Sequence, residues 1–372
     1  MRVLITGAEG FVGRNLCQHL AERADIEILK FTRDDPPAAL LPLVVQADYI
    51  MHLAGVNRPI NEADFEAGNA GLTFDLVQAV RQVGRQVPVV YTSSAQAALD
   101  NAYGASKRKA EDLLKGLARE VGTEVHLFRL PNIFGKWCKP NYNSAVATFC
   151  YNLARDLPIT VRDASAPLSL VYIDDVVRTF VSLLDGCKCE VDGEGYAVVQ
   201  PVYHTTVGHV AERLRAYRNS RVSLVTEPVG TGLDRALYAT YVSYLPTEEF
   251  SYLVPMHSDQ RGTFVEMLKT HDSGQFSFFT AHPGVTRGGH YHHSKTEKFL
   301  VIKGTALFRF RNMLTGESHD LTTSGEQAEI VETVPGWTHD ITNTGSDEML
   351  VMLWANEIFD REHPDTFSAP IG

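Results

Sequence analysis

The sequence has few cysteines and no apolar run long enough to cross a membrane. Its 372 residues include five cysteines, an odd number, and only Cys187 and Cys189 lie close together. Their CKC spacing fits neither a CxxC redox pair nor a zinc knuckle, so we expect five reduced thiols. No stretch reaches the ~18 consecutive apolar residues that a membrane span needs. We therefore expect no disulfide framework and no membrane insertion.

The sequence also lacks a long basic run, a leader segment, an internal repeat and a low-complexity segment. Lys and Arg total 34 against 45 Asp and Glu, a formal charge of -11, so no nucleic-acid partner is expected. Met1 runs straight into a strand-like segment without a basic leader and apolar h-region, which predicts a cytoplasmic protein. The 44% hydrophobic content can fill the two to three cores that the length predicts.

The hydrophobic pattern of the sequence changes near Pro246. Up to about residue 240, apolar runs of strand length alternate with helix-period segments, a rhythm that predicts a doubly wound parallel α/β sheet of the Rossmann type. Beyond that point, short alternating runs separated by turn residues predict an antiparallel β-barrel or sandwich. We predict one domain over residues 1–245 and a second over 246–372. The first expected elements are strands at 3–6, 26–31, 49–54 and 88–93 and a helix at 11–23.

A glycine-rich loop follows the first expected strand. TGAEGFVGRN carries Gly7, Gly10 and Gly13 in a GxxGxxG spacing, and it opens a helix whose backbone N–H groups can hold a pyrophosphate. A close-packed strand-to-helix turn that binds no nucleotide would need the same glycines. The motif alone therefore indicates a dinucleotide site without establishing one.

The residues after the second expected strand bear on the choice of dinucleotide. Thr32 and Arg33 stand where an NAD enzyme usually presents an acidic residue to the ribose hydroxyls, and an arginine there favours the 2′-phosphate of NADP. Asp34 and Asp35 follow directly, and they would repel that phosphate if they pointed inward. The sequence favours NADPH on balance.

A tyrosine and a lysine lie four residues apart in YGASK. On a helix this spacing puts Tyr103 and Lys107 on one face. A phenol with a pKa of ~10 is a poor acid–base catalyst at pH 7, and we expect the adjacent ammonium to lower that pKa. Ser93 and Ser94 end the preceding strand, where a hydroxyl could polarise a carbonyl for hydride attack. A lone YxxxK spacing is common by chance.

The ordered set of glycine loop, HLAG, serine pair and YxxxK resembles an extended short-chain dehydrogenase/reductase over about 240 residues. The resemblance implies that Ser94 is the catalytic serine, with Ser93 as the fallback. It implies that Tyr103 is the general acid and that Lys107 assists it and bonds the nicotinamide ribose. Asn132, in RLPNIFG, is similar to the family's sugar-nucleotide-binding asparagine. The cofactor-binding residues that the resemblance implies are Gly7, Gly10, Phe11, Val12, Gly13, Arg33, Ala54, Tyr103 and Lys107.

Two histidine motifs lie in the β-rich half. In HYHHSKTE, strand alternation puts His290 and His292 on the same face, with Glu297 after a short loop, and VPGWTHDITN supplies His339. Three imidazoles and a carboxylate that converge inside a barrel make a divalent metal site. A surface histidine cluster and a turn histidine are the alternative. Alternation sends His293 to the opposite face, so we expect it to be structural unless a bulge intervenes.

This pattern, over about residues 276–354, resembles the two cupin motifs. The family's PxG is replaced here by Pro335 directly before Gly336, which leaves the turn geometry open. Zinc, iron, nickel and manganese all accept nitrogen-rich ligands, and the ligand set does not separate them. We choose zinc, with one ion per chain, because the resemblance of the whole chain, described next, implies it.

Nearly the full length is similar to the bifunctional capsular polysaccharide biosynthesis enzymes of the bacterial N-acetyl-L-fucosamine pathway. That resemblance implies a homodimer that acts on a UDP-linked 4-keto-6-deoxy-N-acetylhexosamine. The cupin domain would epimerise C3 of UDP-2-acetamido-2,6-dideoxy-4-hexulose. The N-terminal domain would then reduce the C4 ketone with NADPH to UDP-N-acetyl-6-deoxy-L-talosamine, for capsule or O-antigen synthesis.

Elementary chemistry supports this order of steps. The proton on C3 is acidic only while C4 is a ketone, because the carbanion delocalises into an enolate that a cation can stabilise. Two other hypotheses stay open. One is a C4 reductase whose cupin is a structural or dimerising module. The other is a regulatory sugar-nucleotide sensor, which the Ser94, Tyr103 and Lys107 set argues against.

Overall fold

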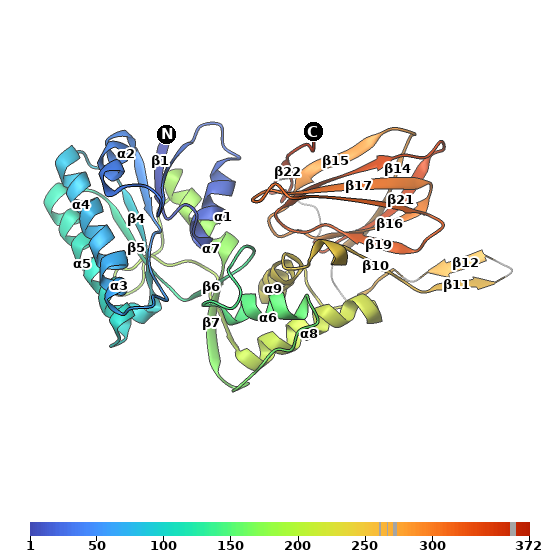
Figure 1. Ribbon diagram of the computed structural model, residues 1–372, viewed down its shortest axis with the longest axis horizontal. Helices are drawn as coiled ribbons and strands as arrows, with labels where there is room; N and C mark the ends of the chain where they lie inside the picture. The colour runs from blue at the N-terminus through green and yellow to red at the C-terminus, as the bar shows by residue number, and fades with distance from the viewer. Residues whose placement is uncertain (260–261, 266, 271–273, 358–361) are drawn as a thin grey trace. The chain divides into compact units, whose positions relative to one another are not determined.

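The computed structural model describes residues 1–259, 262–265, 267–270, 274–357 and 362–372 (Figure 1). They form two compact units, one of residues 1–144 and 168–204 and the other of residues 145–167 and 205–372. Helices α6 (Ala145–Leu153), α8 (Val207–Ser223) and α9 (Gly232–Val242) therefore belong with the β-rich part of the chain. The boundary at 245/246 stays a prediction about folding domains. Among the described helices, none combines the length and apolarity that a membrane crossing requires.

The first unit is built on a parallel sheet with strand order β2-β1-β3-β4-β5. Its inner strands are buried on both faces, as the near-continuous apolar runs around Leu4 and Val90 require. This confirms the doubly wound parallel sheet that the βαβ rhythm predicts. The bounds are β1 (Arg2–Thr6), β2 (Glu27–Phe31), β3 (Tyr49–His52), β4 (Val89–Ser94) and β5 (Val125–Leu130).

Helices cover both faces of this sheet (Figure 1). On one side α1 (Phe11–Leu20) packs with α7 (Ile173–Leu184), and on the other lie α2 (Leu40–Gln46), α4 (Leu72–Val83) and α5 (Ala102–Val121). α1 ends three residues before the expected end, because the exposed residues 21 and 22 no longer continue its buried face. Strand order reverses between β1 and β3, the point at which such sheets bind ligands at the carboxyl ends of their strands.

Several short elements complete this part of the fold. A π-helical segment, η2 (Glu66–Gly71), joins α3 (Ala63–Phe65) to α4. A small sheet has the order β6-β7-β8. Its strands are β6 (Asn132–Phe134), β7 (Pro167–Tyr172) and β8 (Tyr203–Thr206).

The second unit contains two five-stranded antiparallel sheets with orders β10-β19-β16-β21-β14 and β18-β17-β20-β15-β22. Their inner faces meet, since the Phe299 ring of one sheet lies 5.6 Å from the Phe308 ring of the other. The antiparallel β domain expected from the alternating runs is confirmed. The bounds are β10 (Ser251–Leu253), β14 (Gln275–Ala281), β15 (Thr286–Tyr291), β16 (Glu297–Lys303), β17 (Thr305–Asn312), β18 (Ser318–Ser324), β19 (Glu329–Glu332), β20 (Trp337–Asn343), β21 (Met349–Ala355) and β22 (Phe367–Ser368).

Two minor pairings flank these sheets. β11 (Met256–Asp259) and β12 (Gly262–Val265) form an antiparallel pair, and β9 (Val225–Thr226) pairs in parallel with β13 (Lys269–Thr270).

A buried charge cluster joins the helices of the second unit to its β-strands. Glu332 of β19 forms ion pairs with Lys298 of β16 and with Arg221 of α8. The Tyr238 hydroxyl of α9 lies 3.4 Å from the same carboxylate. All four side chains are buried. Burial alone would raise the pKa of Glu332, but the two cations hold that pKa below its ordinary value.

We predict that Glu332→Ala destabilises the second unit by about 3–5 kcal/mol, because it leaves two buried cations without their carboxylate. Urea unfolding would measure the loss. Glu326→Ala is the matched control, since Glu326 is an exposed carboxylate in the turn before β19, and we expect it to change stability by less than about 0.5 kcal/mol. Equal stability of the two variants would show that the cluster does not hold the helices to the sheet.

Candidate active sites

The predicted dinucleotide loop lies where β1 meets α1. Gly7 has a positive φ of 70°, and a Cβ at this position would lie 2.7 Å from the backbone of Ala54, just after β3. A Cβ on Gly13 would lie 2.2 Å from the Gly7 carbonyl oxygen. Only glycine lets strand, loop and helix approach this closely. The loop therefore sits at the point where the strand order reverses, which is the ligand-binding edge of the sheet.

The first turn of α1 is open to an anion. Gly10 stands at the N-cap, and among the described residues no side chain caps the helix. Phe11 and Val12 begin the helix, and the N–H groups of a first turn have no acceptor within it. The helix dipole also favours negative charge at this end. The loop therefore fits the pyrophosphate of a dinucleotide.

The turn after β2 shows where one of the two aspartates, Asp35, directs its carboxylate. The Asp35 carboxylate accepts hydrogen bonds from the backbone N–H of Thr32 at 2.7 Å and from the Thr32 hydroxyl at 2.8 Å. These bonds lower the pKa of Asp35. They also direct its carboxylate toward Thr32, within the same loop. Arg33 is exposed, so its guanidinium is accessible to a ligand at this corner.

The three predicted catalytic residues lie at the end of β4 and the start of α5. Ser94 is the last residue of β4, and its side chain lies near enough to the Tyr103 hydroxyl to affect the pKa of that phenol. Lys107 lies one turn further along α5, where its buried Nζ donates to the Thr92 carbonyl at 3.0 Å. Burial lowers the pKa of Lys107 to about 8.

The pKa of Tyr103 differs from the sequence-based expectation. Burial raises the pKa of Tyr103, and the neighbouring Ser94 hydroxyl offsets only part of that rise. Lys107 is not among the groups that shift the pKa of Tyr103, and its ammonium donates to the Thr92 carbonyl. A phenol that stays protonated at neutral pH is a proton donor, which is what the reduction of a ketone needs.

Ser93 takes part in a different network. Its hydroxyl donates to Glu111 at 2.5 Å, on the opposite face of β4 from Ser94. Glu111 is buried, and it also accepts two hydrogen bonds from Arg129 and one from the Tyr196 hydroxyl. The Ser93 hydroxyl is therefore held by a structural carboxylate, whereas Ser94 remains beside Tyr103.

Sequence reasoning missed Asn69, in the π-helical segment η2. Its side-chain amide holds both backbone polar groups of Val56, at 2.9 and 3.0 Å, and donates to Ser106 at 2.9 Å. A Cβ on Gly55, the glycine of HLAG, would lie 2.9 Å from Asn69 and 3.0 Å from the Lys107 amine. π-Helical turns are frequent at functional sites, but an isolated asparagine in a helix gives no periodic signal.

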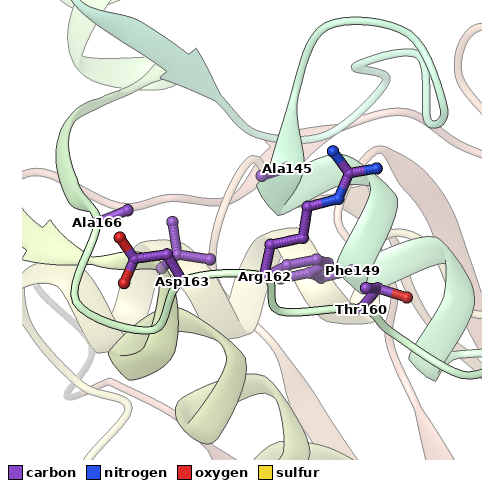
Figure 2. A pocket seen from close by; sticks show the side chains of 7 residues that line it. Ala145, Phe149, Thr160, Arg162, Asp163 and Ala166 are labelled. Carbon is purple, nitrogen blue, oxygen red and sulfur yellow. The ribbon is translucent and has the colours of Figure 1, made fainter.

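Asn132 begins β6 and is exposed, and its amide lies 3.5 Å from the Ser169 carbonyl oxygen. A hollow of about 500 Å³ lies in the second unit (Figure 2). In this hollow the Arg162 side chain extends beside the ring of Phe149, as Figure 2 shows. The Arg162 guanidinium is exposed, and an exposed guanidinium can bind a phosphorylated ligand. Sequence reasoning missed the hollow, whose lining residues are Ala145, Phe149, Thr160, Arg162, Asp163, Ala166 and Val207.

The four predicted metal ligands converge in the second unit. His290 lies in β15, His292 directly after it, Glu297 at the start of β16 and His339 in β20. One potential ligand atom from each lies within 4.8 Å of all the others. The His290 and His339 rings are 4.8 Å apart between centroids, and His292 Nε2 lies 3.2 Å from Glu297 Oε2.

The chemistry of this group fits a divalent cation. The buried Nε2 of His339 has no hydrogen-bond partner among the described residues and lies 3.6 Å from Glu297 Oε2. His292 Nδ1 donates to the Asp365 carbonyl at 2.5 Å, which leaves Nε2 for the group, as in metal-bound histidines. Burial, followed by the neighbouring imidazoles, lowers the pKa of His290 to about 3, so this ring is neutral. Neutral imidazole is the form that binds a metal.

A β-bulge aims His290 at the group. Gly288 and Gly289 have positive φ angles of 96° and 75°, and the pairing with β20 shifts by one residue between Gly288 and His290. Gly289 is therefore the extra residue, and His290 comes to lie opposite His339. His293 lies outside the group of four. Its buried ring packs on Phe367 at 4.9 Å.

The departure from the cupin pattern forms an ordinary turn. Gly336 has a φ of 82°, and the Trp337 N–H donates to the Val334 carbonyl at 3.0 Å. Proline followed by glycine at the centre of such a turn is typical of type II. The turn leads directly into β20, and His339 is the third residue of that strand.

Comparison with known proteins identifies the family. The model of the NAD dependent epimerase/dehydratase family matches residues 3–198, and the chain belongs to this family. A second model, the polysaccharide biosynthesis C-terminal domain, matches residues 257–367. The chain is 62% identical over 372 residues to the UDP-2-acetamido-2,6-beta-L-arabino-hexul-4-ose reductase of Pseudomonas aeruginosa, covering all of this chain and 99% of the relative.

Two solved structures share the whole architecture. The capsular polysaccharide assembling protein CapF of Staphylococcus aureus is 39% identical, with a TM-score of 0.69 and full coverage of both chains. CapF with the inhibitor 3-isopropenyl-tropolone is 36% identical, with a TM-score of 0.63 and full coverage of both chains.

Proposed function

We propose that this chain is a bifunctional sugar-nucleotide enzyme of capsule or O-antigen synthesis. Its β-barrel epimerises C3 of UDP-2-acetamido-2,6-dideoxy-4-hexulose, and its parallel-sheet unit then reduces the C4 ketone to UDP-N-acetyl-6-deoxy-L-talosamine. The observation that carries the proposal is the presence of two separate chemical groups on one chain: the Ser94, Tyr103 and Lys107 set and the cluster of three histidines and a glutamate. The full-length likeness to a UDP-hexulose reductase supports the substrate class.

The first group supplies what ketone reduction needs besides a hydride. NADPH, held by the glycine loop and Arg33, supplies the hydride when bound. Tyr103 donates a proton to the C4 oxygen, since its raised pKa keeps the phenol protonated. Ser94 donates a hydrogen bond to the same oxygen and polarises the carbonyl. With a pKa of about 8, Lys107 is mostly cationic at pH 7, and we assign its ammonium to the hydroxyls of the nicotinamide ribose.

The second group supplies a place for the enolate of C3 epimerisation. A divalent cation, zinc in our proposal, would be held by His290, His292, Glu297 and His339 and would supply Lewis-acid stabilisation of that charge. The adjoining cavity of about 150 Å³ is lined by five apolar side chains together with the proposed ligands His290, Glu297 and His339 and with Arg287 and Asp340. The apolar lining residues are Phe279, Phe299, Phe308, Ile341 and Leu353.

The remaining parts of the proposal concern binding and assembly. We assign a sugar-nucleotide contact to Asn132 of the first unit. Separately, the exposed Arg162 in the hollow of Figure 2 gives the second unit a place where a phosphate group can bind. We propose a cytoplasmic homodimer. Phe276 and Phe278 support a partner surface, because 47% and 71% of these residues are exposed on β14 at the border of its sheet.

A second candidate is a C4 reductase whose barrel only stabilises or dimerises the protein. The name of the Pseudomonas relative, which mentions reduction alone, favours it. Exchange of the C3 proton with solvent deuterium separates the two candidates, because a purely structural barrel catalyses no exchange.

We predict that Tyr103→Phe lowers reduction by about 10²–10⁴-fold, since the proton donor is lost, and leaves deuterium exchange at C3 intact. NADPH oxidation and mass spectrometry of the substrate would follow the two activities together. Tyr151→Phe, which lies outside the proposed sites, is the control and should change neither. Loss of both activities in folded Tyr103→Phe would contradict separate sites.

We predict that the enzyme prefers NADPH to NADH through Arg33. A charge-assisted contact with the 2′-phosphate is worth roughly 1.5–3 kcal/mol, a preference of about tenfold or more. Arg33→Ala should remove most of it, and Arg119→Ala, an exposed arginine on α5, should not. The ratio of kcat/KM for the two coenzymes measures the effect. An unchanged ratio in Arg33→Ala would refute the assignment.

We predict one divalent metal per chain, and that His339→Ala loses it together with C3 exchange, because the other ligands cannot replace its bond. His293→Ala should keep the metal, since its ring packs on Phe367 outside the group. Elemental analysis of both variants provides the test. Stoichiometric metal in a His290→Ala, His339→Ala double variant would overturn the ligand assignment.

A further inference from the structure

The C-terminal segment 362–372, called here the strap, lies along the sheet that carries the histidines. β22 within it pairs with β15, so that Ser368 lies opposite His290 and Phe367 opposite Tyr291. Further along, the carbonyl of Ala369 accepts a hydrogen bond from Thr338 at 2.5 Å, and that of Pro370 accepts one from Arg311 at 3.2 Å. Strand pairing and side-chain bonds thus hold the strap over most of its described length.

Asp365 of the strap binds the loop that joins His292 to Glu297, two of the proposed metal ligands. Its half-buried carboxylate accepts hydrogen bonds from the backbone N–H groups of His293, Ser294 and Lys295, at 2.9, 2.8 and 2.7 Å. Its own carbonyl accepts the Nδ1–H of His292 at 2.5 Å. One strap residue therefore fixes the backbone after His292 and also selects which ring nitrogen of His292 faces the group.

Thr366, the next strap residue, acts on the carboxylate ligand through a lysine. Its hydroxyl lies 3.1 Å from the buried Lys295 Nζ, which lies 3.3 Å from Glu297 Oε1. The other oxygen of Glu297, Oε2, is the one near His292 and His339. Lys295 thus occupies one carboxylate oxygen and leaves the other for the histidine side.

We propose that the strap is part of the metal centre: Asp365 positions His292, and Lys295, held by Thr366, positions Glu297 as a one-oxygen ligand. This inference rests on the proposed metal site. Outer hydrogen bonds of this kind orient metal ligands and commonly change metal affinity by 10–100-fold. Asp365 and Lys295 are therefore positioning residues, which touch the ligands and not the metal.

Zinc affinity of the full-length apoprotein, measured by competition with a chromophoric chelator, tests the proposal without any need for substrate. Asp365→Ala releases the loop after His292 but keeps the main-chain carbonyl that accepts from His292 Nδ1. We expect this variant and Lys295→Met each to weaken zinc binding by about 10–100-fold. Asp365→Asn should recover part of the affinity, because its amide oxygen can still accept from the loop. Arg311→Ala removes a strap contact that involves no residue beside the ligands, and it should bind zinc like the unaltered protein.

Ligand geometry is tested with Co²⁺, whose visible absorption bands depend on the number and arrangement of its ligands. The Co²⁺ bands of Lys295→Met should change while its far-UV circular dichroism spectrum stays unaltered, which supports the positioning role. Loss of a residue with a merely structural role would not change the Co²⁺ bands of folded protein. Wild-type protein that binds no zinc would remove the proposed metal site itself. Wild-type protein that binds one zinc, with both variants within threefold of it and unchanged Co²⁺ spectra, would overturn only the role of the strap.

Discussion

Both units depend on carboxylates that are removed from water and are stabilised by ion pairs and hydrogen bonds. An unpaired buried charge is costly, so each one fixes the groups around it. Glu111 holds Ser93 and Arg129 beneath the end of β4. Glu332 ties α8 to the β-sheet, and Asp365 fastens the loop next to His292. In each case a single acid determines where several neighbouring backbone or side-chain groups lie, and the chemical groups are placed on that framework.

Burial also prepares the protonation states that the two proposed reactions need. It disfavours the charged form of any group, so it raises the pKa of the phenol of Tyr103 and lowers that of the imidazole of His290. The first effect keeps a proton ready to donate, and the second keeps a nitrogen lone pair ready to bind a cation. One physical cause thus serves acid catalysis in one unit and ligation in the other.

Features with a regular spacing could be predicted from the sequence, and features made by tertiary contacts could not. Alternation placed His290 and His292 together, and the βαβ rhythm gave the parallel sheet. The pKa of Tyr103 was predicted in the wrong direction, because helical spacing to a lysine says nothing of how deeply the phenol is buried. Asn69 and Asp365 were missed, since each acts on segments distant in the sequence and leaves no periodic signature.

The extra residue at Gly289 changes which side chains of β15 face the cavity. Side chains three positions apart on a regular strand point to opposite faces, yet Arg287 and His290 both line the barrel cavity. The inserted glycine resets the phase of the alternation, so that a guanidinium and an imidazole reach the same space from a single segment. Deletion of Gly289 would shift the strand register by one residue. The side chains on one side of the deletion would then point to the opposite face of the sheet. The length of this strand, as much as its residue types, therefore defines the composition of the cavity.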